Sequence, residues 1–365
     1  MSAVPDGARA VLKAAEAPDS RKAVAGFLAQ ISRDAAFQLE ACVRCGQCAE
    51  ACHFYLVTGD PRYTPAYKLK PMVKAYQRER APFSALKTKL GLAPPEVTAE
   101  ELTEWSELLY DSCNLCGRCT LVCPMGIDIA GMVRRAREGM AAGGFAPTDL
   151  YQAARRALDT GSPIGVGWPA LRRQIELQEQ ETGLKVPVDV EGADYLVVLS
   201  SMEIIGFAEI IGALARIFHQ AGVSWTLPSS GFEATNIGVQ IGSRDVAAAL
   251  LERIVAAAER LKVKYVISPE CGHAYSALRW EGPNLLGRPY PFKVVHIVEL
   301  LDQLAREGRL RTRGKDTRRL TFHDPCQIVR RGGLPQAPRR LMSQVSDRFV
   351  EMPDRGIANF CCGGG

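Results

Sequence analysis

The residues best suited to chemistry in this 365-residue chain are its cysteines, which fall in tight clusters. Two stretches share the spacing C-x2-C-x2-C-x3-C. Three cysteines at this spacing hold one [4Fe–4S] cluster, and the fourth binds the other cluster when two such motifs occur. The spacing therefore predicts two clusters. One would use Cys42, Cys45, Cys48 and Cys123, and the other would use Cys113, Cys116, Cys119 and Cys52.

A second group of cysteines, near the end of the sequence, has a different pattern. Cys326 stands alone, and the adjacent Cys361 and Cys362 precede a run of three glycines. Adjacent cysteines do not suit a zinc site or an ordinary cubane motif, in which two or more residues separate the ligands. Two neighbouring thiolates can instead bind irons of one cluster, above a backbone that glycine allows to turn tightly. This pattern indicates a redox centre for chemistry on sulfur.

The composition places these clusters in an ordinary globular protein. The apolar share is 47%, the charged share is 23% and the net charge is +5. These values are typical of soluble domains. The first twenty residues lack the apolar core of a secretory signal, and charged residues interrupt the most apolar stretch, 195–218, so no membrane span is expected. Clustered cysteines without a signal favour metal binding in a reducing cytoplasm over disulfides.

The residues around the two repeated motifs predict helices. Residues 21–40 have the periodicity of one amphipathic helix. Thr98 and Glu101 form a capping-box pattern ahead of an apolar stripe. Asp128 should cap a helix that ends near Gly143. With a long insert between the motifs, the domain resembles the α-helical ferredoxins of respiratory complexes. The insert carries aromatic residues that either pack in the core or shield a cluster: Phe54, Tyr55, Tyr63, Tyr67 and Tyr76.

Apolar strands alternate with helices in the second half of the chain, which predicts an α/β domain with a mostly parallel sheet. The expected strands are 195–199, 223–227, 263–268 and 319–322, and the expected helices include one up to 220, 243–261 and 297–306.

This α/β domain also contains a pattern of internal duplication. One half runs strand, Cys326, helix, strand, Cys361-Cys362-Gly363. The other runs strand, Ser200-Ser201, helix, strand, Ser229-Ser230-Gly231. Serine hydroxyls are poor ligands for iron–sulfur clusters, so the first half should carry no cluster of its own. It keeps one thiol, Cys271, just after a strand, where α/β folds place their sites.

These motifs carry a resemblance to a known family. The pattern from Cys326 to Gly363 is similar to the first part of the "CCG" cysteine-rich domain of heterodisulfide reductases. Together with the double ferredoxin motif, it makes the chain similar to the D-type subunit of these reductases. The segments that begin at Cys45 and at Pro269 resemble the DsrK-type subunit, which belongs to a membrane complex linked to dissimilatory sulfite reductase.

The resemblance implies an organisation of the chain. An N-terminal helical segment would cover residues 1–36, an α-helical ferredoxin domain 37–145, a connector 146–190 and a cysteine-rich α/β domain 191–365. In this family a complete CCG motif supplies a third, noncubane [4Fe–4S] cluster, which needs a further Cys-x-x-Cys. Since the sequence stops shortly after Cys362, we expect it to be truncated there, with Cys326, Cys361 and Cys362 as an incomplete ligand set.

The same resemblance implies an activity: reduction, or in reverse formation, of a disulfide- or trisulfide-type bond. The catalytic candidates are Cys326, Cys361, Cys362 and Cys271, and Cys271 is either a further ligand or a thiol near the substrate, unless it is an inert buried cysteine. His273 and His323 could donate protons to a leaving thiolate, or could be structural. The direction of electron flow, the substrate and the cluster potentials do not follow from the sequence.

The resemblance also suggests partners. These are a quinone-reactive membrane subunit, a small DsrC-type sulfur-carrier protein and other complex subunits, with the chain attached through a partner to the cytoplasmic face of the inner membrane. Basic residues on both sides of Cys326 form either a solvated face or a landing site for an acidic protein or anionic thiol: Arg309, Arg311, Arg313, Lys315, Arg318, Arg319, Arg330, Arg331, Arg339 and Arg340.

The sequence disfavours one kind of partner and leaves one alternative function open. No nucleic-acid-binding motif accompanies the basic residues, so a nucleic-acid partner is not expected. The chain could also be an electron-wiring subunit of a flavin-dependent glycolate or glycerol-3-phosphate dehydrogenase, with the chemistry done elsewhere. An intact noncubane cluster would favour the catalytic interpretation.

Overall fold

The computed structural model describes residues 5–363, which divide into two compact units. Unit 1 contains the described residues up to Ala154, the segment Gly238–Val246 and the described residues from Phe360 onward. Unit 2 contains Arg155–Ile237 and Ala247–Asn359. The helices α10 (Thr148–Thr160), α14 (Ile237–Ile241) and α15 (Arg244–Arg260) run from one unit into the other.

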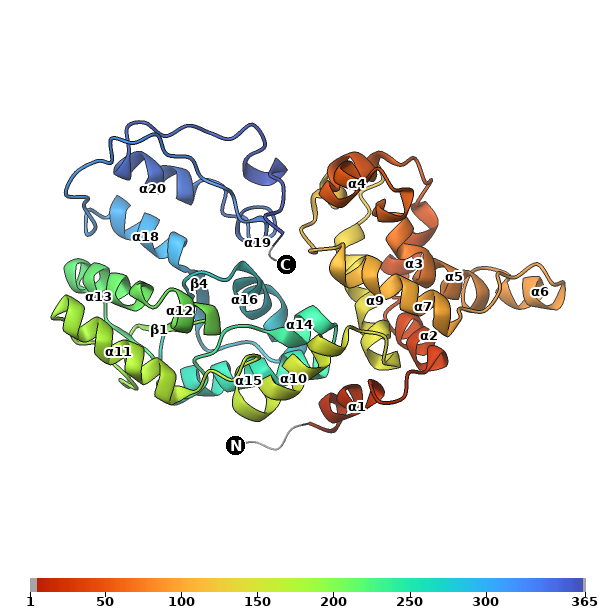
Figure 1. Ribbon diagram of the computed structural model, residues 1–365, viewed down its shortest axis with the longest axis horizontal. Coiled ribbons are helices and arrows are strands. Elements are labelled where there is room, and N and C mark those ends of the chain that lie inside the picture. Colours follow the sequence, from red (N-terminus) through yellow and green to blue (C-terminus); the bar gives the residue numbers. More distant parts are fainter. Residues whose placement is uncertain (1–4, 364–365) are drawn as a thin grey trace. The chain divides into compact units, whose positions relative to one another are not determined.

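Unit 1 is built from helices and short helical turns (Figure 1). Its longer helices are α1 (Asp6–Ala14), α2 (Ser20–Ala29), α3 (Arg33–Ala41), α5 (Lys70–Glu79), α7 (Ala99–Ser106) and α9 (Ile129–Gly143). Its shorter ones are η1 (Gln47–Ala51), α4 (His53–Thr58), η2 (Pro61–Tyr63), η3 (Tyr67–Leu69), α6 (Ser84–Lys89), the π-helical turn η4 (Glu107–Asp111) and α8 (Arg118–Leu121).

The sequence-based expectations for these helices are largely confirmed. Thr98 and Glu101 form the predicted capping box of α7. Asp128 caps α9 by accepting a hydrogen bond from the Gly131 N–H at 3.0 Å. The single helix expected over 21–40 is wrong, because the chain forms α2 and α3 with a break between them. The Ser32 hydroxyl accepts from the Ala35 N–H and starts the second helix.

Unit 2 is an α/β unit with a four-stranded sheet of order β2-β1-β3-β4. Each strand pair is parallel. The strands are β1 (Tyr195–Val197), β2 (Trp225–Thr226), β3 (Tyr265–Ser268) and β4 (Lys293–His296). The remaining helices are α11 (Trp168–Thr182), α12 (Ser201–Gly206), α13 (Glu209–Ala221), α16 (Gly272–Ser276), η5 (Ala277–Glu281), α17 (Gly282–Leu286), α18 (Ile297–Arg306), α19 (Cys326–Val329), α20 (Ala337–Val345) and η6 (Gly356–Ala358).

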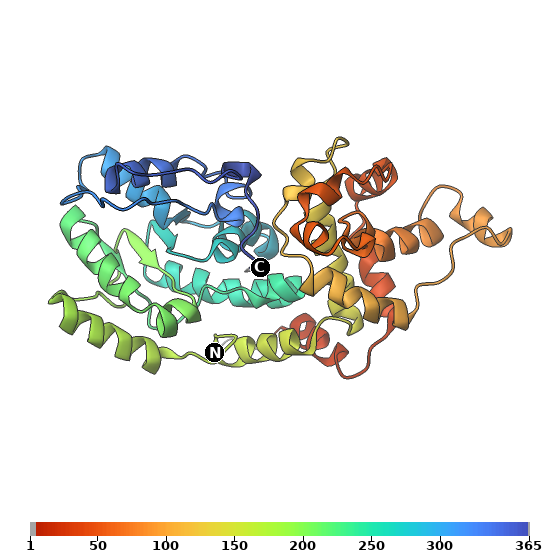
Figure 2. The same ribbon diagram turned by 45° about the horizontal axis from the view of Figure 1, so that its top comes forward.

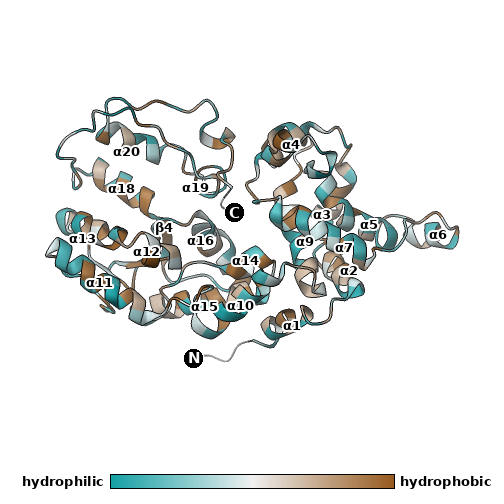
Figure 3. Cartoon of the chain, in the orientation of Figure 1, coloured by the Kyte–Doolittle hydropathy of each residue, from teal (hydrophilic) through white to brown (hydrophobic). Residues whose placement is uncertain are grey.

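Apolar residues of this sheet are buried on both faces, as the pleat of a doubly covered parallel sheet requires. Val197 and Ile267 pack with residues of α11, α13 and α18. Leu196 and Val266 point to the other side and pack with α15, α16 and η5. The helices accordingly mix hydrophobic and hydrophilic residues around their circumference (Figure 3). The carboxyl ends of β1 and β3 lead into Ser200 and Cys271, so the fold brings these two positions to one edge of the sheet.

The predicted parallel sheet is confirmed, and one predicted strand is wrong. Residues 319–322 make only an isolated bridge between Leu320 and Phe349. Thr321 is exposed and Leu320 and Phe322 are only half-buried, so this stretch has no apolar face to add to a sheet. The strand β4 was not among the predicted strands. No helix of residues 5–363 is both long and apolar enough to cross a bilayer.

The helices α2 and α9 approach so closely that glycine is required between them. A Cβ added at Gly139 would lie 2.1 Å from the Phe27 ring and 2.7 Å from the Ala23 carbonyl oxygen. The backbone of α2 cannot move away without opening the core of unit 1, since Ala23 and Phe27 are fully buried.

We expect Gly139→Ala to lower the free energy of unfolding by about 1–3 kcal/mol, the usual cost of overpacking a core. Denaturant unfolding of the purified protein followed by circular dichroism measures the change. Gly206→Ala is the control, because its new Cβ would meet nothing closer than the Met202 methyl at 3.8 Å. Equal stability of the two variants would contradict the prediction.

Candidate metal centres

The two repeated cysteine motifs have the same backbone conformation. Arg44 and Leu115, each just before the second cysteine of its motif, have φ values of 54° and 50°. Gly46 and Gly117, just after that cysteine, have φ values of 80° and 77°. A left-handed residue other than glycine costs roughly 1–2 kcal/mol. The same left-handed conformation occurs at matching positions of both motifs. This indicates that the turns are shaped to orient the thiols, at a cost in backbone energy.

Each motif lines a cavity, and each cavity is completed by a cysteine of the other motif. The first cavity is lined by Cys42, Cys45, Cys48 and Cys123. The second is lined by Cys113, Cys116, Cys119 and Cys52. These sets agree with the two ligand sets predicted from the spacing. Most other lining residues are apolar, among them Leu69 and Ile127 in the first cavity and Ala130 and Val133 in the second.

The electrostatics of these thiols indicate what the cavities can hold. Burial raises the pKa of Cys119, and the neighbouring Cys113, Cys116 and Cys52 raise it further. Burial also raises the pKa of Cys48, with a further contribution from Cys42 and Cys45. Four thiolates gathered in an apolar cavity are stable only when a cation lies among them.

An iron–sulfur cluster fits this requirement better than one metal ion. Within residues 5–363, no three His, Cys, Asp or Glu side chains already converge as ligands of one ion. In a cubane cluster each thiolate binds a different iron, so the four sulfurs surround a cavity instead of meeting at a point. The donor chemistry and the placement of the eight cysteines therefore fit [4Fe–4S] clusters.

A buried lysine lies beside the second cavity. Lys68 is 2% exposed, lines the cavity and donates a hydrogen bond to the Ser112 carbonyl oxygen, next to Cys113. Its ammonium also lies 5.1 Å from the centre of the Phe54 ring, which lines the same cavity. Burial lowers the pKa of the adjacent His53, and the charges of Lys68 and Arg118 lower it further. The second cavity thus has a positive electrostatic environment.

A buried arginine holds the backbone of the second motif in place. Arg137 of α9 donates to the Leu109 carbonyl at 2.9 Å, to the Cys113 carbonyl at 2.6 Å and to the Gln240 carbonyl at 3.1 Å. Its guanidinium also lies 4.8 Å from the centre of the Tyr110 ring. Three main-chain segments of unit 1 thereby meet on one side chain that is 4% exposed.

Sequence reasoning missed both cations. Arg137 could have been found, because it lies four residues after Val133 on the inward stripe of α9, where a charge must have a structural partner. Lys68 carried no comparable signal. Among the aromatic residues of the insert, Phe54 lines the second cavity and Tyr76 is buried in the core.

Cys271 and Cys326 come from packed elements of unit 2. Cys271 caps α16, and its sulfur accepts from the Ala274 N–H at 3.4 Å. A Cβ on Gly272 would lie 2.9 Å from the Gln327 Cβ, so α16 touches the first turn of α19, which starts at Cys326. Burial raises the pKa of Cys271 to about 11, which keeps it a thiol at neutral pH. His273 follows in α16 and is half-buried.

Three serines of unit 2 are bonded to carboxylates. The Ser200 N–H donates to Glu203 at 2.6 Å, and the Ser200 hydroxyl lies 3.4 Å from Glu270. The Ser201 hydroxyl donates to Glu233, and Ser229 makes the same contact with Asp189. Burial raises the pKa of Glu203 to about 7. Serines and carboxylates thus form polar contacts in the stretches that follow β1 and β2.

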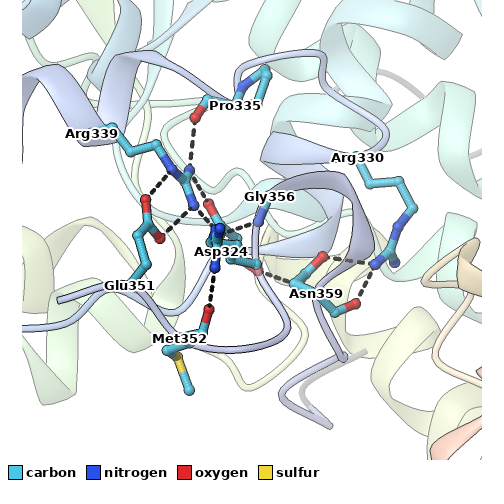
Figure 4. A network of polar contacts seen from close by, with 9 residues as sticks. Asp324, Arg330, Pro335, Arg339, Glu351, Met352, Gly356 and Asn359 are labelled. Carbon is cyan, nitrogen blue, oxygen red and sulfur yellow. Dashed lines mark hydrogen bonds and ion pairs between the residues drawn. The ribbon is translucent and has the colours of Figure 1, made fainter.

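An ion pair organises the segment that carries Cys326 (Figure 4). Both carboxylate oxygens of Asp324 accept from Arg339 at 2.8 Å, and Asp324 also accepts from the Gly356 N–H at 2.5 Å. The Asn359 amide donates to the Asp324 carbonyl, and Arg330 donates to Asn359 Oδ1 at 2.7 Å. The Asp324 side chain is fully buried. The network joins the residues before Cys326 to those before Phe360.

Cys361 and Cys362 follow in the terminal segment of unit 1, whereas Cys326 belongs to unit 2, so the three are not gathered within either unit. Cys361 is half-buried and Cys362 is exposed. The preceding Phe360 has its ring centre 3.5 Å from the guanidinium carbon of Arg118, which lies in the second motif. Within unit 1, a residue adjacent to Cys361 therefore contacts the motif that lines the second cavity.

Many of the basic residues near Cys326 are engaged in structure. Arg309 donates to the Ala221 carbonyl at 2.7 Å, Arg340 pairs with Asp302 at 2.7 Å, and Arg318 pairs with Asp316. With Arg330 and Arg339 in the Asp324 network, this part of the charge is used within the unit. Arg311, Arg313 and Arg319 are exposed. The basic cluster is thus partly structural and partly a solvated face.

Comparisons with known proteins agree with this geometry. Residues 38–127 match the family model described as a 4Fe-4S dicluster domain, and residues 320–365 match a cysteine-rich domain. Over 90% of its length, the chain is 27% identical to the Hdr-like menaquinol oxidoreductase iron–sulfur subunit 2 of Archaeoglobus fulgidus, of which it covers 67%. No solved structure matches the chain.

Two further relatives cover the same share of the chain. It is 28% identical to the D-type subunit of the dihydromethanophenazine:CoB–CoM heterodisulfide reductase of Methanosarcina barkeri, covering 78% of that protein. It is 26% identical to an EtfAB:quinone oxidoreductase of Syntrophomonas wolfei, covering 48% of it. The chain is therefore an iron–sulfur protein with a dicluster domain and a cysteine-rich domain. It resembles the D-type subunit of heterodisulfide reductases, as the motifs predicted.

We expect Lys68→Met to make the reduction potential of a cluster in the second cavity more negative by tens of millivolts. A nearby positive charge stabilises the extra electron of a reduced cluster, and burial strengthens that effect. Potentiometry followed by electron paramagnetic resonance measures the shift. Lys70→Met is the control, because Lys70 does not line the cavity. An unchanged potential in Lys68→Met would refute the role of this charge.

We expect Asp324→Asn to lower the free energy of unfolding by about 2–3 kcal/mol, because it breaks a buried bidentate pair. Burial raises the pKa of Asp324, but the hydrogen bonds from Arg339 and Gly356 outweigh it and hold the pKa below the usual 3.8. The stabilisation is complete above pH 3.8 and is lost only as pH falls through the lower folded value. Denaturant unfolding should therefore show the same loss of unfolding free energy in Asp324→Asn at every pH between 8 and 5.

The matched control for this variant is Asp316→Asn, which removes an Asp–Arg pair whose Arg318 side chain is 80% exposed. An exposed pair contributes little to stability. Similar losses of unfolding free energy in the two variants would mean that the buried Asp324–Arg339 pair contributes no more to stability than the exposed pair does.

Proposed function

We propose that this chain is the iron–sulfur oxidoreductase subunit of a membrane-associated electron-transfer complex. It would couple electron transfer through [4Fe–4S] clusters to the reduction, or formation, of a disulfide- or trisulfide-type bond. The observation that carries the proposal is the pair of four-cysteine cavities, each closed by a cysteine of the other motif. Since the two cavities share adjacent stretches of chain, clusters bound there would lie close enough to exchange electrons.

The proposed ligands of the first cubane cluster are Cys42, Cys45, Cys48 and Cys123, and those of the second are Cys113, Cys116, Cys119 and Cys52. The lining of the two cavities and the matching backbone turns support this assignment. A third, noncubane cluster would have Cys326, Cys361 and Cys362 among its ligands. The match of residues 320–365 to a cysteine-rich domain supports it.

The chemistry requires two electrons and two protons for each disulfide. The sulfur–sulfur bond breaks, each sulfur gains one electron and one proton, and two thiols leave. Each cubane cluster passes one electron at a time, so a site cluster would have to hold the half-reduced state. Contact between Phe360 and Arg118 supports a route from the second cluster to the site at Cys361.

Cys271 and His273 are proposed to lie beside this site. The packing of α16 against α19 supports a position near Cys326. With its pKa raised to about 11, Cys271 would act at neutral pH as a protonated thiol and not as an attacking thiolate. His273 would supply a proton to a leaving thiolate.

We further propose that the two halves of the cysteine-rich domain arose by duplication and that the first half lost its cluster. Ser200 follows β1 and caps α12, as Cys326 follows an extended stretch and opens α19. The hydrogen bonds from these serines to carboxylates support a half that folds without metal.

The partners we propose are a quinone-reactive membrane subunit and a sulfur-carrying substrate, such as a small DsrC-type protein. Relatives named as a menaquinol oxidoreductase subunit and as a dihydromethanophenazine-linked heterodisulfide reductase subunit support the quinone side. The complex would attach to the cytoplasmic face of the inner membrane through that partner. The carrier remains an expectation from the DsrK resemblance.

A second candidate is an electron-wiring subunit without its own catalytic site. Similarity to an EtfAB:quinone oxidoreductase favours it, because that name describes transfer between a flavoprotein and a quinone. The serine-substituted half of the domain is also consistent with it. The two candidates differ in whether a substrate-sensitive third cluster exists.

We expect full-length protein that is oxidised and then treated with a thiol to give a paramagnetic signal that depends on the thiol. Cys361→Ser should remove this signal and leave both cubane signals, and iron should fall from about twelve to about eight per chain. The control is Ser343→Ala, which changes a residue of α20 and should keep all three signals. Absence of a thiol-dependent signal in the wild-type protein would favour the wiring role.

We expect Cys52→Ser to impair the cluster of the second cavity although Cys52 belongs to the first motif. Cys123→Ser should do the reverse, because each serine removes the ligand that closes the other motif's cavity. Potentiometric titration followed by electron paramagnetic resonance distinguishes the two clusters. Loss of the first cluster in Cys52→Ser would refute the crossed assignment.

A further inference from the structure

The helix α6 lies at the end of an arm of unit 1. The chain leaves α5 at Glu79, forms α6, turns at Gly91 and returns to α7. In both views α6 projects beyond the helices of its own unit (Figures 1 and 2). Arg78 holds the base of the arm, because it donates to the Pro94 carbonyl at 2.8 Å and pairs with Glu96 at 3.0 Å. The arm is thus a fixed feature of the fold.

The arm exposes large apolar side chains. The exposed fraction is 76% for Phe83, 54% for Leu86, 62% for Leu90 and 70% for Leu92. Leu86 lies within α6, and Phe83 and Leu90 are the residues directly before and after this helix, so exposed apolar side chains occur along its whole length. Single exposed leucines are ordinary on a protein surface, but a continuous apolar face usually marks an interaction site.

The charges of the arm have one sign. Residues 80–95 contain Arg80, Lys87 and Lys89 and no aspartate or glutamate. All three cations are exposed. On a helical wheel Lys87 and Lys89 lie on opposite sides of the line through Leu86 and Leu90. Basic residues that flank a short leucine and phenylalanine face are typical of segments that lie in the headgroup region of a membrane.

We propose that residues 80–95 bind directly to an anionic lipid surface. The apolar face would enter the boundary between headgroups and acyl chains, and the two lysines would reach out sideways to lipid phosphates. Each cation near an anionic surface strengthens binding about five-fold. The inference goes beyond the proposed function, in which the chain reaches the membrane only through a partner subunit.

The test is co-sedimentation of the iron-loaded full chain with lipid vesicles. The protein should bind vesicles of phosphatidylcholine mixed with phosphatidylglycerol and should bind vesicles of phosphatidylcholine alone much more weakly. High salt should weaken the binding, because it screens the charges. Absence of binding to the anionic vesicles at low salt would overturn the proposal.

Two variants locate the binding site. Lys87→Glu combined with Lys89→Glu should weaken binding by about 30-fold or more, whereas Arg311→Glu with Arg313→Glu, outside the arm, should have a much smaller effect. Phe83→Ser with Leu86→Ser and Leu90→Ser should abolish measurable binding. Its control is Met202→Ser with Ile205→Ser and Phe207→Ser, which changes side chains of α12 and the residue after it that are 54%, 53% and 51% exposed.

The outcomes separate this inference from the proposed function. Iron content and the cluster signals report the proposed function, and all four variants should keep them. If the serine variant of the arm loses iron, the charge-reversal variant still decides, because it leaves every apolar residue in place. If both arm variants bind the anionic vesicles as strongly as the wild-type chain does, the proposal is overturned. It is also overturned if the wild-type chain binds no vesicles and the arm variants lose binding to a protein partner.

Discussion

The constraint on which unit 1 depends is the need to gather four thiols around each of two apolar cavities. Neither motif can meet this need alone, because its fourth cysteine lines the cavity of the other. The helices between the motifs therefore have to bring the second motif back beside the first. The close glycine contact joins α2, which precedes the first motif, to α9, which follows the second, and Arg137 of α9 bonds the main chain at Cys113.

Unit 2 meets a different requirement with ordinary α/β topology. Its parallel strands end at one edge, where Ser200 and Cys271 stand. The Asp324–Arg339 pair joins the segment before Cys326 to α20 (Figure 4), and Arg340 of α20 pairs with Asp302 of α18. Hydrogen bonds and ion pairs of side chains thus take the place of strand pairing in this segment, whose residues are too exposed and too charged to form a strand of the sheet.

Much of this arrangement could be predicted from the sequence, for physical reasons. Cysteine spacing limits geometry strongly, so the two sets of four agree with the cavities. Local signals such as the Thr98 box and the Asp128 cap depend on neighbouring residues only, and both were confirmed. The cap at Ser32 is also a local signal and was overlooked, whereas the burial of Lys68 depends on its tertiary surroundings. Residues 319–322 had strand-like composition but no buried face, which only the fold could reveal.

The serine–carboxylate pairs of unit 2 have a consequence for how the protein can evolve. A cysteine at position 201 would take from Glu233 the hydroxyl that now binds it, and would set a thiol against buried carboxylates whose negative charge opposes thiolate formation. Introducing a metal ligand there would require several coordinated changes, each unfavourable alone. The serine–carboxylate contacts therefore disfavour a thiolate at this end of the sheet.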